Sequence, residues 1–213
     1  MQKEKKAAAL IWKGDIFDAL AYFELKSPRI DLQCLIVPVD EEGNLWGSRV
    51  PFPLLEAQAE SLEISVRKCV LSQWSWEGLS LGCRDLLKDQ SLELLAFSDF
   101  QRDPDWEKLA KAEGLSLLWP MQSWTIELAR NAFLSMGHEA LIYESKVPEF
   151  LGTAVNRAVL ERAMQEGELF FKAFVYNGPF FQRKIALGCQ EGQAAEAGPL
   201  LLQLLDKKSE RYH

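Results

Sequence analysis

Residues 92–103 read Leu92-Glu93-Leu94-Leu95-Ala96-Phe97-Ser98-Asp99-Phe100-Gln101-Arg102-Asp103, and this stretch decides the fold. Its first half is a largely apolar run with the length of a buried strand. Its second half places polar and charged groups directly after that strand. Because parallel sheets of α/β proteins bind ligands at the carboxyl ends of their strands, we predict a ligand site here.

Strand-like runs alternate with helix-like segments on both sides of this stretch. We predict strands at residues 7–12, 32–39, 65–71, 92–97 and 115–119. We predict helices at residues 16–24, 54–62, 79–87, 104–113 and 125–136. Strands that alternate with helices of this length pair in parallel through right-handed crossovers. The sequence therefore predicts an α/β fold of the Rossmann-like type, a parallel five-stranded sheet with helices on both faces.

The pattern changes after residue 137. We predict a strand at 140–144, a helix at 154–164, and a hairpin whose strands at 170–176 and 182–187 flank Asn177-Gly178-Pro179. The apolar run at 200–205 predicts a helix, either docked on its own domain or supplied to a partner subunit. The expected organisation is a sheet domain over 1–137, a smaller α+β lobe over 138–190 and a tail over 191–213.

The composition limits the classes of function. The chain has 213 residues, of which 48% are hydrophobic and 26% charged, and its net charge is −7. Proteins that bind nucleic acid or membrane surfaces generally carry an excess of Lys and Arg. No apolar stretch approaches the roughly 20 residues of a membrane span, and the first residues lack the features of a secretory signal. We therefore expect a cytoplasmic protein with neither a nucleic-acid nor a membrane partner.

Residues that bind metals are sparse in this sequence. The four cysteines are widely spaced without a Cys-x-x-Cys pair, and the two histidines are His138 and His213. We therefore expect no metal site, and we expect the cysteines to be reduced thiols packed in or near strands. His138 directly follows Gly137, which predicts a position at a helix end or on the surface.

Two segments are the most specific in the chain, Ser98-Asp99-Phe100-Gln101-Arg102 and Phe174-Val175-Tyr176-Asn177-Gly178-Pro179. They are accompanied by Trp12-Lys13-Gly14-Asp15, by the helix at 54–62 and by Leu117-Leu118-Trp119-Pro120. With these segments in this order, residues 5–188 resemble the diphthine-ammonia ligase family. That family lies within the N-type ATP pyrophosphatases, which have a PP-loop and an adenine nucleotide alpha hydrolase-like fold.

The resemblance implies a HUP-type version of the predicted sheet and an ATP-dependent formation of an amide. In such a reaction a carboxylate attacks the α-phosphorus of ATP, pyrophosphate leaves, and ammonia then displaces AMP. The implied ligands are an adenine nucleotide, Mg²⁺ bound with ATP, and an acyl (carboxylate) substrate. By resemblance to the family's phosphate loop, Ser-Gly-Gly-Lys-Asp-Ser, the residues expected at the phosphates are Lys13, Gly14 and Asp15. Those expected to orient AMP or the acyl substrate are Arg49, Ser98, Asp99, Gln101 and Arg102.

The chain departs from the family at two places. Its loop, Ile11-Trp12-Lys13-Gly14-Asp15-Ile16-Phe17, is one residue shorter, with Trp12 and Ile16 where the two serines would fall. We expect an indole at the mouth of the loop to block the close backbone approach that a pyrophosphate group needs. In the second lobe, residues 166–172 carry phenylalanines near the point where the family has polar or acidic side chains.

The predicted site residues also have purely structural interpretations. Asp99 and Arg102 would then form an ion pair that fixes the strand-to-helix turn, while Ser98 and Gln101 would bond to backbone groups of that turn. Arg49 would be a solvated surface residue.

Two functions from different classes follow from this sequence. The first is an ATP-dependent, AMP-forming carboxylate–ammonia ligase, whose catalytic residues the sequence does not identify. The second is a catalytically inactive family member that acts as a ligand-binding or assembly protein, for which a homodimer is one possible assembly.

Overall fold

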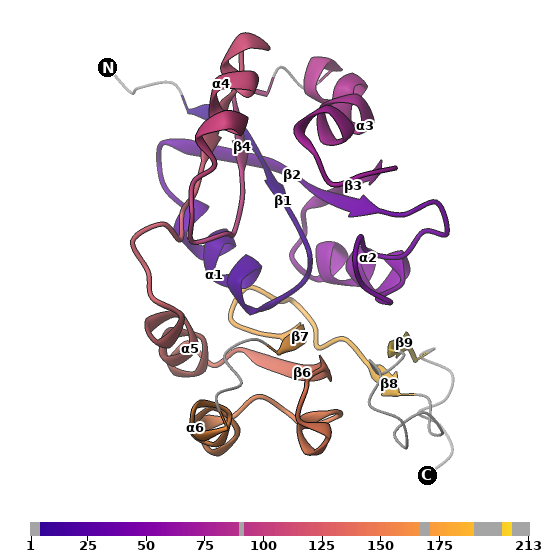
Figure 1. Ribbon diagram of the computed structural model, residues 1–213, viewed down its shortest axis with the longest axis vertical. Coiled ribbons are helices and arrows are strands. Elements are labelled where there is room, and N and C mark those ends of the chain that lie inside the picture. Colours follow the sequence, from indigo (N-terminus) through magenta and orange to yellow (C-terminus); the bar gives the residue numbers. More distant parts are fainter. Residues whose placement is uncertain (1–4, 90–91, 167–170, 190–201, 206–213) are drawn as a thin grey trace.

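The computed structural model describes residues 5–89, 92–166, 171–189 and 202–205. Five strands form one sheet in the order β3-β2-β1-β4-β5, and every neighbouring pair is parallel (Figure 1). The strands are β1 (Lys6–Ile11), β2 (Ile30–Val39), β3 (Ser65–Val70), β4 (Leu94–Ala96) and β5 (Ser116–Leu118). The prediction of a Rossmann-like α/β fold with a parallel five-stranded sheet is therefore confirmed.

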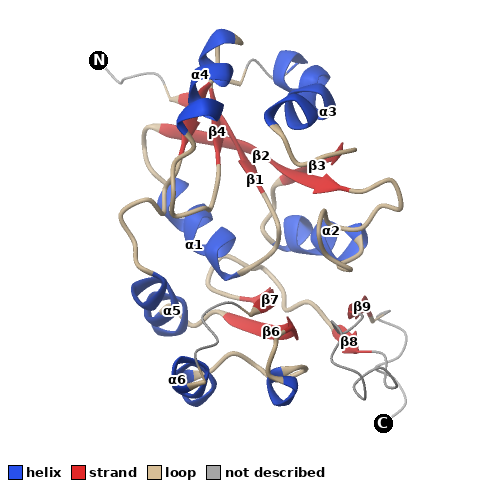
Figure 2. Ribbon diagram, in the orientation of Figure 1, coloured by secondary structure: helices blue, strands red, loops and turns tan. Residues whose placement is uncertain are grey.

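Helices cover both faces of this sheet (Figure 2). On one face lie α1 (Ile16–Leu25) and α2 (Phe52–Ser61), and on the other lie α3 (Trp76–Asp89) and α4 (Pro104–Ala112). Successive side chains of a strand point to opposite faces. Accordingly Leu10 packs in the core on the side of α1 and α2, whereas Ala9 and Ile11 pack in the core on the side of α3 and α4.

Capping side chains determine where several helices begin. Asp103 accepts hydrogen bonds from the backbone amides of Asp105 and Trp106, both at 3.0 Å, so α4 begins at Pro104. Thr125 accepts a hydrogen bond from Leu128 N at 3.1 Å and caps α5 (Ile126–Ser135). Each such cap satisfies an amide that has no partner within its own helix.

The chain after α5 forms a second, antiparallel pair of strands. β6 (Glu139–Glu144) pairs with β7 (Lys172–Asn177), and between them lie the short helix η1 (Pro148–Phe150) and α6 (Arg157–Gln165). Val175 N donates to Gly14 O at 3.0 Å, which ties β7 to the loop after β1. The division of the chain into domains at residue 137 stays a prediction.

The predicted hairpin around Asn177-Gly178-Pro179 is wrong, because the partner of β7 is β6 rather than residues 182–187. Pro179 has no N–H to give to a ladder. Beyond it, one backbone bond joins the two predicted strands, from Ile185 N to Tyr176 O at 2.9 Å, and the chain also bonds to the end of α2. Gln182 N donates to Ser61 O at 2.7 Å, and Ser61 Oγ donates to Arg183 O at 2.6 Å.

The tail adds two short antiparallel strands, β8 (Leu187–Cys189) and β9 (Leu202–Leu204). The predicted helix over 200–205 is therefore wrong at residues 202–204, whose backbone groups pair with those of β8 instead. Residues 200–201 and 206–213 lie outside the described residues. None of the helices in the described ranges is long and apolar enough to cross a membrane.

Candidate functional site

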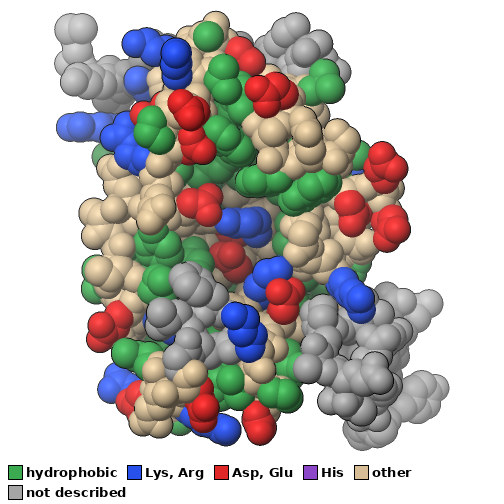
Figure 3. Space-filling model, in the orientation of Figure 1, with side chains coloured by type: hydrophobic (Ala, Val, Ile, Leu, Met, Phe, Trp, Pro, Cys, Tyr) green, Lys and Arg blue, Asp and Glu red, His purple; other side chains and the backbone are tan. Residues whose placement is uncertain are grey.

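The sheet order brings the ends of two strands to one point. From β1 the chain continues to β2 on one side, whereas β4 lies on the other side, so the carboxyl ends of β1 and β4 border the place where the winding changes direction. Figure 3 shows one face of the molecule with a hollow near its middle, where acidic and basic side chains gather between apolar walls. This edge is where α/β sheets of this kind hold their ligands.

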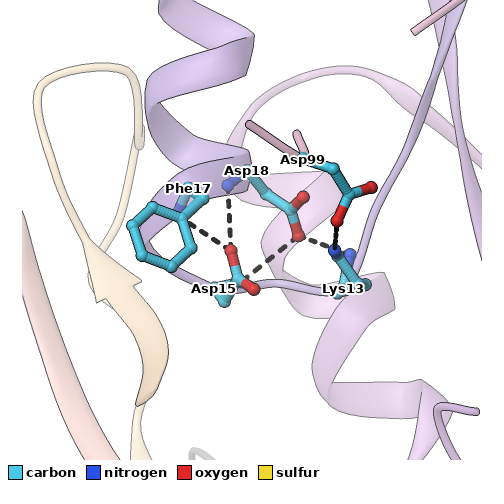
Figure 4. Close-up of polar contacts among 5 residues, drawn as sticks. All are labelled: Lys13, Asp15, Phe17, Asp18 and Asp99. Atoms are coloured by element: carbon cyan, nitrogen blue, oxygen red, sulfur yellow. Dashed lines mark hydrogen bonds and ion pairs between the residues drawn. The ribbon is translucent and has the colours of Figure 1, made fainter. Parts of the chain in front are cut away.

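Two of the predicted site residues meet at this point. Lys13 follows β1 and Asp99 follows β4, and Lys13 Nζ lies 3.4 Å from Asp99 Oδ1 (Figure 4). Their side chains are 31% and 52% exposed, so solvent screens much of the attraction. The segments 12–15 and 98–102, which the resemblance assigns to one ligand site, therefore meet through Lys13 and Asp99.

Trp12 lies away from the mouth of the loop, so the expectation that its indole blocks that mouth is wrong. Its side chain is completely buried, and Trp12 Nε1 donates to Gln58 Oε1 of α2 at 2.7 Å. Gln58 Nε2 in turn donates to Gly14 O at 3.0 Å and to Val175 O at 2.6 Å. One buried amide thus joins the loop, α2 and β7.

The lack of a side chain at Gly14 allows the loop to pack closely against α2. Its φ is +79°, and a Cβ at this position would lie 2.5 Å from Gln58 Oε1 and 2.7 Å from Leu55 Cδ2. Glycines of phosphate loops permit a close approach of the backbone to the ligand. In this loop the close approach is made to α2.

Carboxylates of the chain itself accept hydrogen bonds from the backbone amides around the start of α1 (Figure 4). Asp15 Oδ1 accepts from Phe17 N and Asp18 N, both at 2.9 Å. Asp18 Oδ2 accepts from Lys13 N at 2.5 Å and from Asp15 N at 3.4 Å. Asp15 and Asp18 form a capping box, and their carboxylates accept from four amides in total, two of them in the first turn of α1, where a helix otherwise attracts anions.

Asp18 is the residue that sequence reasoning missed. It is fully buried, and burial together with the charge of Asp15 raises the pKa of its carboxyl to about 7, despite Lys13 nearby. The pattern of two acids three residues apart at 15 and 18 is a helix-start signature, which is the signal that could have identified it.

The charges around Lys13 are predominantly negative. Burial lowers the pKa of Lys13, but the charges of Asp15, Asp18 and Asp99 outweigh that effect and raise it above its ordinary value. Ser98 lies close enough to lower the pKa of Asp18. Even so, neither Ser98 Oγ nor Asp18 Oδ1, both buried, makes a hydrogen bond within the described part of the chain.

The other residues of the 98–102 block contact different parts of the protein. Arg102 forms an ion pair with Glu107 of α4, so the alternative of an Arg102–Asp99 pair is wrong. Phe100 packs edge-on against Phe17, with ring centroids 4.9 Å apart. Gln101 is exposed and lines a small cavity together with Asp99.

Arg49 is exposed in the loop between β2 and α2. Its neighbours in that loop contact the second strand pair, because Lys172 Nζ donates to Gly47 O at 3.0 Å and Ser48 Oγ lies 3.4 Å from the Tyr143 hydroxyl. Within the described ranges no hydrogen bond or ion pair joins Arg49 to the other predicted site residues.

His138 lies at the end of α5, as predicted, where its backbone N–H donates to Phe133 O at 3.2 Å, but its side chain is buried rather than on the surface. Its ring stacks on Phe133 with centroids 5.0 Å apart, and neither ring nitrogen has a hydrogen-bond partner among the described residues. Burial lowers the pKa of His138 to about 4, so the ring is neutral at pH 7. Over the same part of the chain, no three His, Cys, Asp or Glu side chains form a group that could hold a metal ion.

No protein-family model matches this sequence. No curated protein matches it significantly either.

Proposed function

We propose that this chain is a catalytically inactive relative of the diphthine-ammonia ligase-like ATP pyrophosphatases that acts as a ligand-binding protein. The sheet order and the meeting of Lys13 with Asp99 support the ancestry. The occupied amides at the start of α1 support the loss of the reaction.

The residues of the loop do not fit a triphosphate. The backbone amides of Asp15 and Asp18 already bond to carboxylates in the capping box, and those of Lys13 and Phe17 bond to the same two side chains. A phosphate at this position would have to displace Asp18, which is fully buried. It would also approach Asp15 and Asp99, and like charges at close range repel. The single observation that carries the proposal is therefore the Asp18 carboxylate bonded to Lys13 N.

A second candidate is an active ligase that binds an adenine nucleotide, and one observation favours it. Lys13, Ser98 and Asp99 converge on the strand ends where such a nucleotide would lie. In that case the Lys13 ammonium would serve as a cation for a single phosphate, as in AMP.

Thermal unfolding with millimolar ATP and Mg²⁺, or with AMP, distinguishes the two candidates. A ligand at about 100 times its dissociation constant adds about 2.7 kcal/mol to the unfolding free energy. We expect no rise in the unfolding temperature with ATP and no pyrophosphate release with ammonium and a set of carboxylates. A rise with ATP, or release of pyrophosphate, would support the ligase instead.

A further inference from the structure

A small aromatic pocket lies beside the Lys13–Asp99 pair, at the carboxyl ends of β4 and β5. Its volume is about 190 Å³. Its apolar lining consists of the rings of Phe97, Trp74, Trp106 and Trp119. Its polar lining consists of Asp99, Gln101 and Asp103.

The aromatic side chains come from several segments and are held in fixed orientations. Phe97 stacks on Trp119 with centroids 5.8 Å apart and meets Trp106 edge-on at 5.5 Å. Trp74, from the segment between β3 and α3, is tilted against Trp106 at 5.9 Å. Phe97 and Trp119 are buried, whereas Trp74 is 42% exposed, so the pocket has a packed floor and an open wall.

The helices behind this pocket are held together by Glu113, directly after α4. Glu113 accepts hydrogen bonds from Trp76 Nε1 at 3.3 Å and from Ser80 Oγ at 2.7 Å, both on α3. In Figure 1, α3 and α4 lie on the same face of the sheet. The helix that carries Trp106 is therefore bonded to α3 without a ligand.

The pocket combines π faces with negative charge. Two of its lining residues, Asp99 and Asp103, are acidic, and no Lys or Arg lines it. The nearest basic side chains already have acidic partners, since Lys13 pairs with Asp99 and Arg102 pairs with Glu107. The Arg102 guanidinium carbon lies 6.0 Å from the ring centroid of Trp119, so one of these rings already interacts with a cation of the chain.

We infer that this pocket binds a small organic cation, the head group of an alkylated ammonium compound. Faces of tryptophan attract such cations, and nearby carboxylates strengthen the attraction. The volume of about 190 Å³ suits a compact trimethylammonium group better than a nucleotide. The inference rests on the ligand-binding role proposed above, but not on the state of the loop after β1.

The test is a calorimetric titration of the full chain with choline chloride, at constant chloride concentration. The reference ligand is 3,3-dimethylbutanol, which has the same shape without the charge. Asp103→Asn removes a charge from the pocket and keeps a good helix cap. Asp105→Asn is the matched control, because Asp105 lies in the same turn of α4 and does not line the pocket. Trp74→Leu removes the exposed wall.

We expect choline to bind at least about threefold more tightly than its neutral isostere, as expected for a cation–π site with one exposed wall. Asp103→Asn should weaken choline binding about fivefold and Asp105→Asn less than twofold, while Trp74→Leu should abolish it. Equal binding of the neutral isostere, equal weakening by both Asn variants, or no binding of choline would overturn the inference. AMP binding that Trp74→Leu removes, without choline binding, would also overturn it, because the pocket would then hold a nucleobase. None of these results depends on the ATP titration, so the two proposals can fail separately.

Discussion

The loop after β1 and the turn after β4 border the same edge of the sheet, yet they present their polar groups differently. In the loop, the amides around Gly14 bond to Asp15 and Asp18, and the indole of Trp12 bonds inside the core. In the turn, Asp99 and Gln101 face a solvent-accessible cavity. The backbone amides of the loop are bonded within the protein, whereas the polar side chains of the turn are accessible to a ligand.

The loop shows how the N-terminus of α1 is satisfied by side chains of the protein itself. A carboxylate within the chain supplies the acceptor oxygens that a bound phosphate would otherwise supply, so the helix N-terminus stays satisfied. The buried amide of Gln58 then fixes the loop to α2 and β7. We therefore expect substitutions in the loop to affect stability, and substitutions in the turn to affect binding.

Gly14→Ala should produce the largest effect. A Cβ there would lie 2.5 Å from Gln58 Oε1 and would also be strained at a φ of +79°. We expect a loss of about 3 kcal/mol or more in the unfolding free energy, measured by urea denaturation. Gly43→Ala is the control, because Gly43 has a similar φ of +85° with no atom within 4 Å of a Cβ, so it should cost only about 1 kcal/mol. Equal losses would mean that the loop is not closely packed on α2.

Asp18→Asn should change how stability depends on pH. The folded-state pKa of Asp18 is raised to about 7, above an unfolded value of about 3.9. The stabilisation linked to this carboxyl is fully present below the unfolded pKa and is lost as pH rises through the folded pKa. Relative to wild type, Asp18→Asn should therefore gain on the order of 3–4 kcal/mol between pH 4 and pH 8.

Urea denaturation of both proteins at each pH measures this gain. The comparison with wild type cancels the opposite contribution of His138, whose folded pKa is lowered to about 4 and whose stabilisation is lost as pH falls. A difference that does not change with pH would show that Asp18 is not a buried acid.

Gln58→Leu should cost about 2 kcal/mol, because it removes the buried partner of Trp12 Nε1 and of Val175 O, and one of the two hydrogen bonds that Gly14 O accepts. Gln101→Leu is the matched change in the turn and should stay within about 0.5 kcal/mol, since Gln101 is exposed. Chemical denaturation of the pair measures the contrast between the two regions directly. Similar losses of unfolding free energy in both variants would show that the two regions do not differ.

Asp99→Asn should have only a small effect on stability, less than about 1 kcal/mol, because its ion pair with Lys13 is partly exposed. If the turn holds a ligand, Asp99→Asn should change the affinity for that ligand more than it changes stability. A loss of stability in Asp99→Asn as large as that in Gln58→Leu would contradict the view that the turn is free to bind.

The sequence predicted the sheet because apolar runs and helix signals alternate regularly, as at residues 92–97 and 104–113. It did not predict the antiparallel pairing of β7, because Asn177-Gly178 is a local hairpin signal and the competing partner, β6, lies more than thirty residues earlier. The sequence did not predict where the Trp12 side chain points either. That direction depends on Gln58 of α2, and the polarity of Gln58 alone predicts a surface position.

The most direct test of the proposal that the loop after β1 does not bind phosphate is a proton–nitrogen correlation NMR titration that follows the backbone amides of Lys13, Asp15 and Phe17. We predict that these resonances move with pH around a midpoint near 7, as Asp18 ionises, and stay unchanged when ATP and Mg²⁺ are added. Saturable shifts of the same amides with ATP would contradict the account, because they would show that a phosphate can take the place of the Asp18 carboxylate.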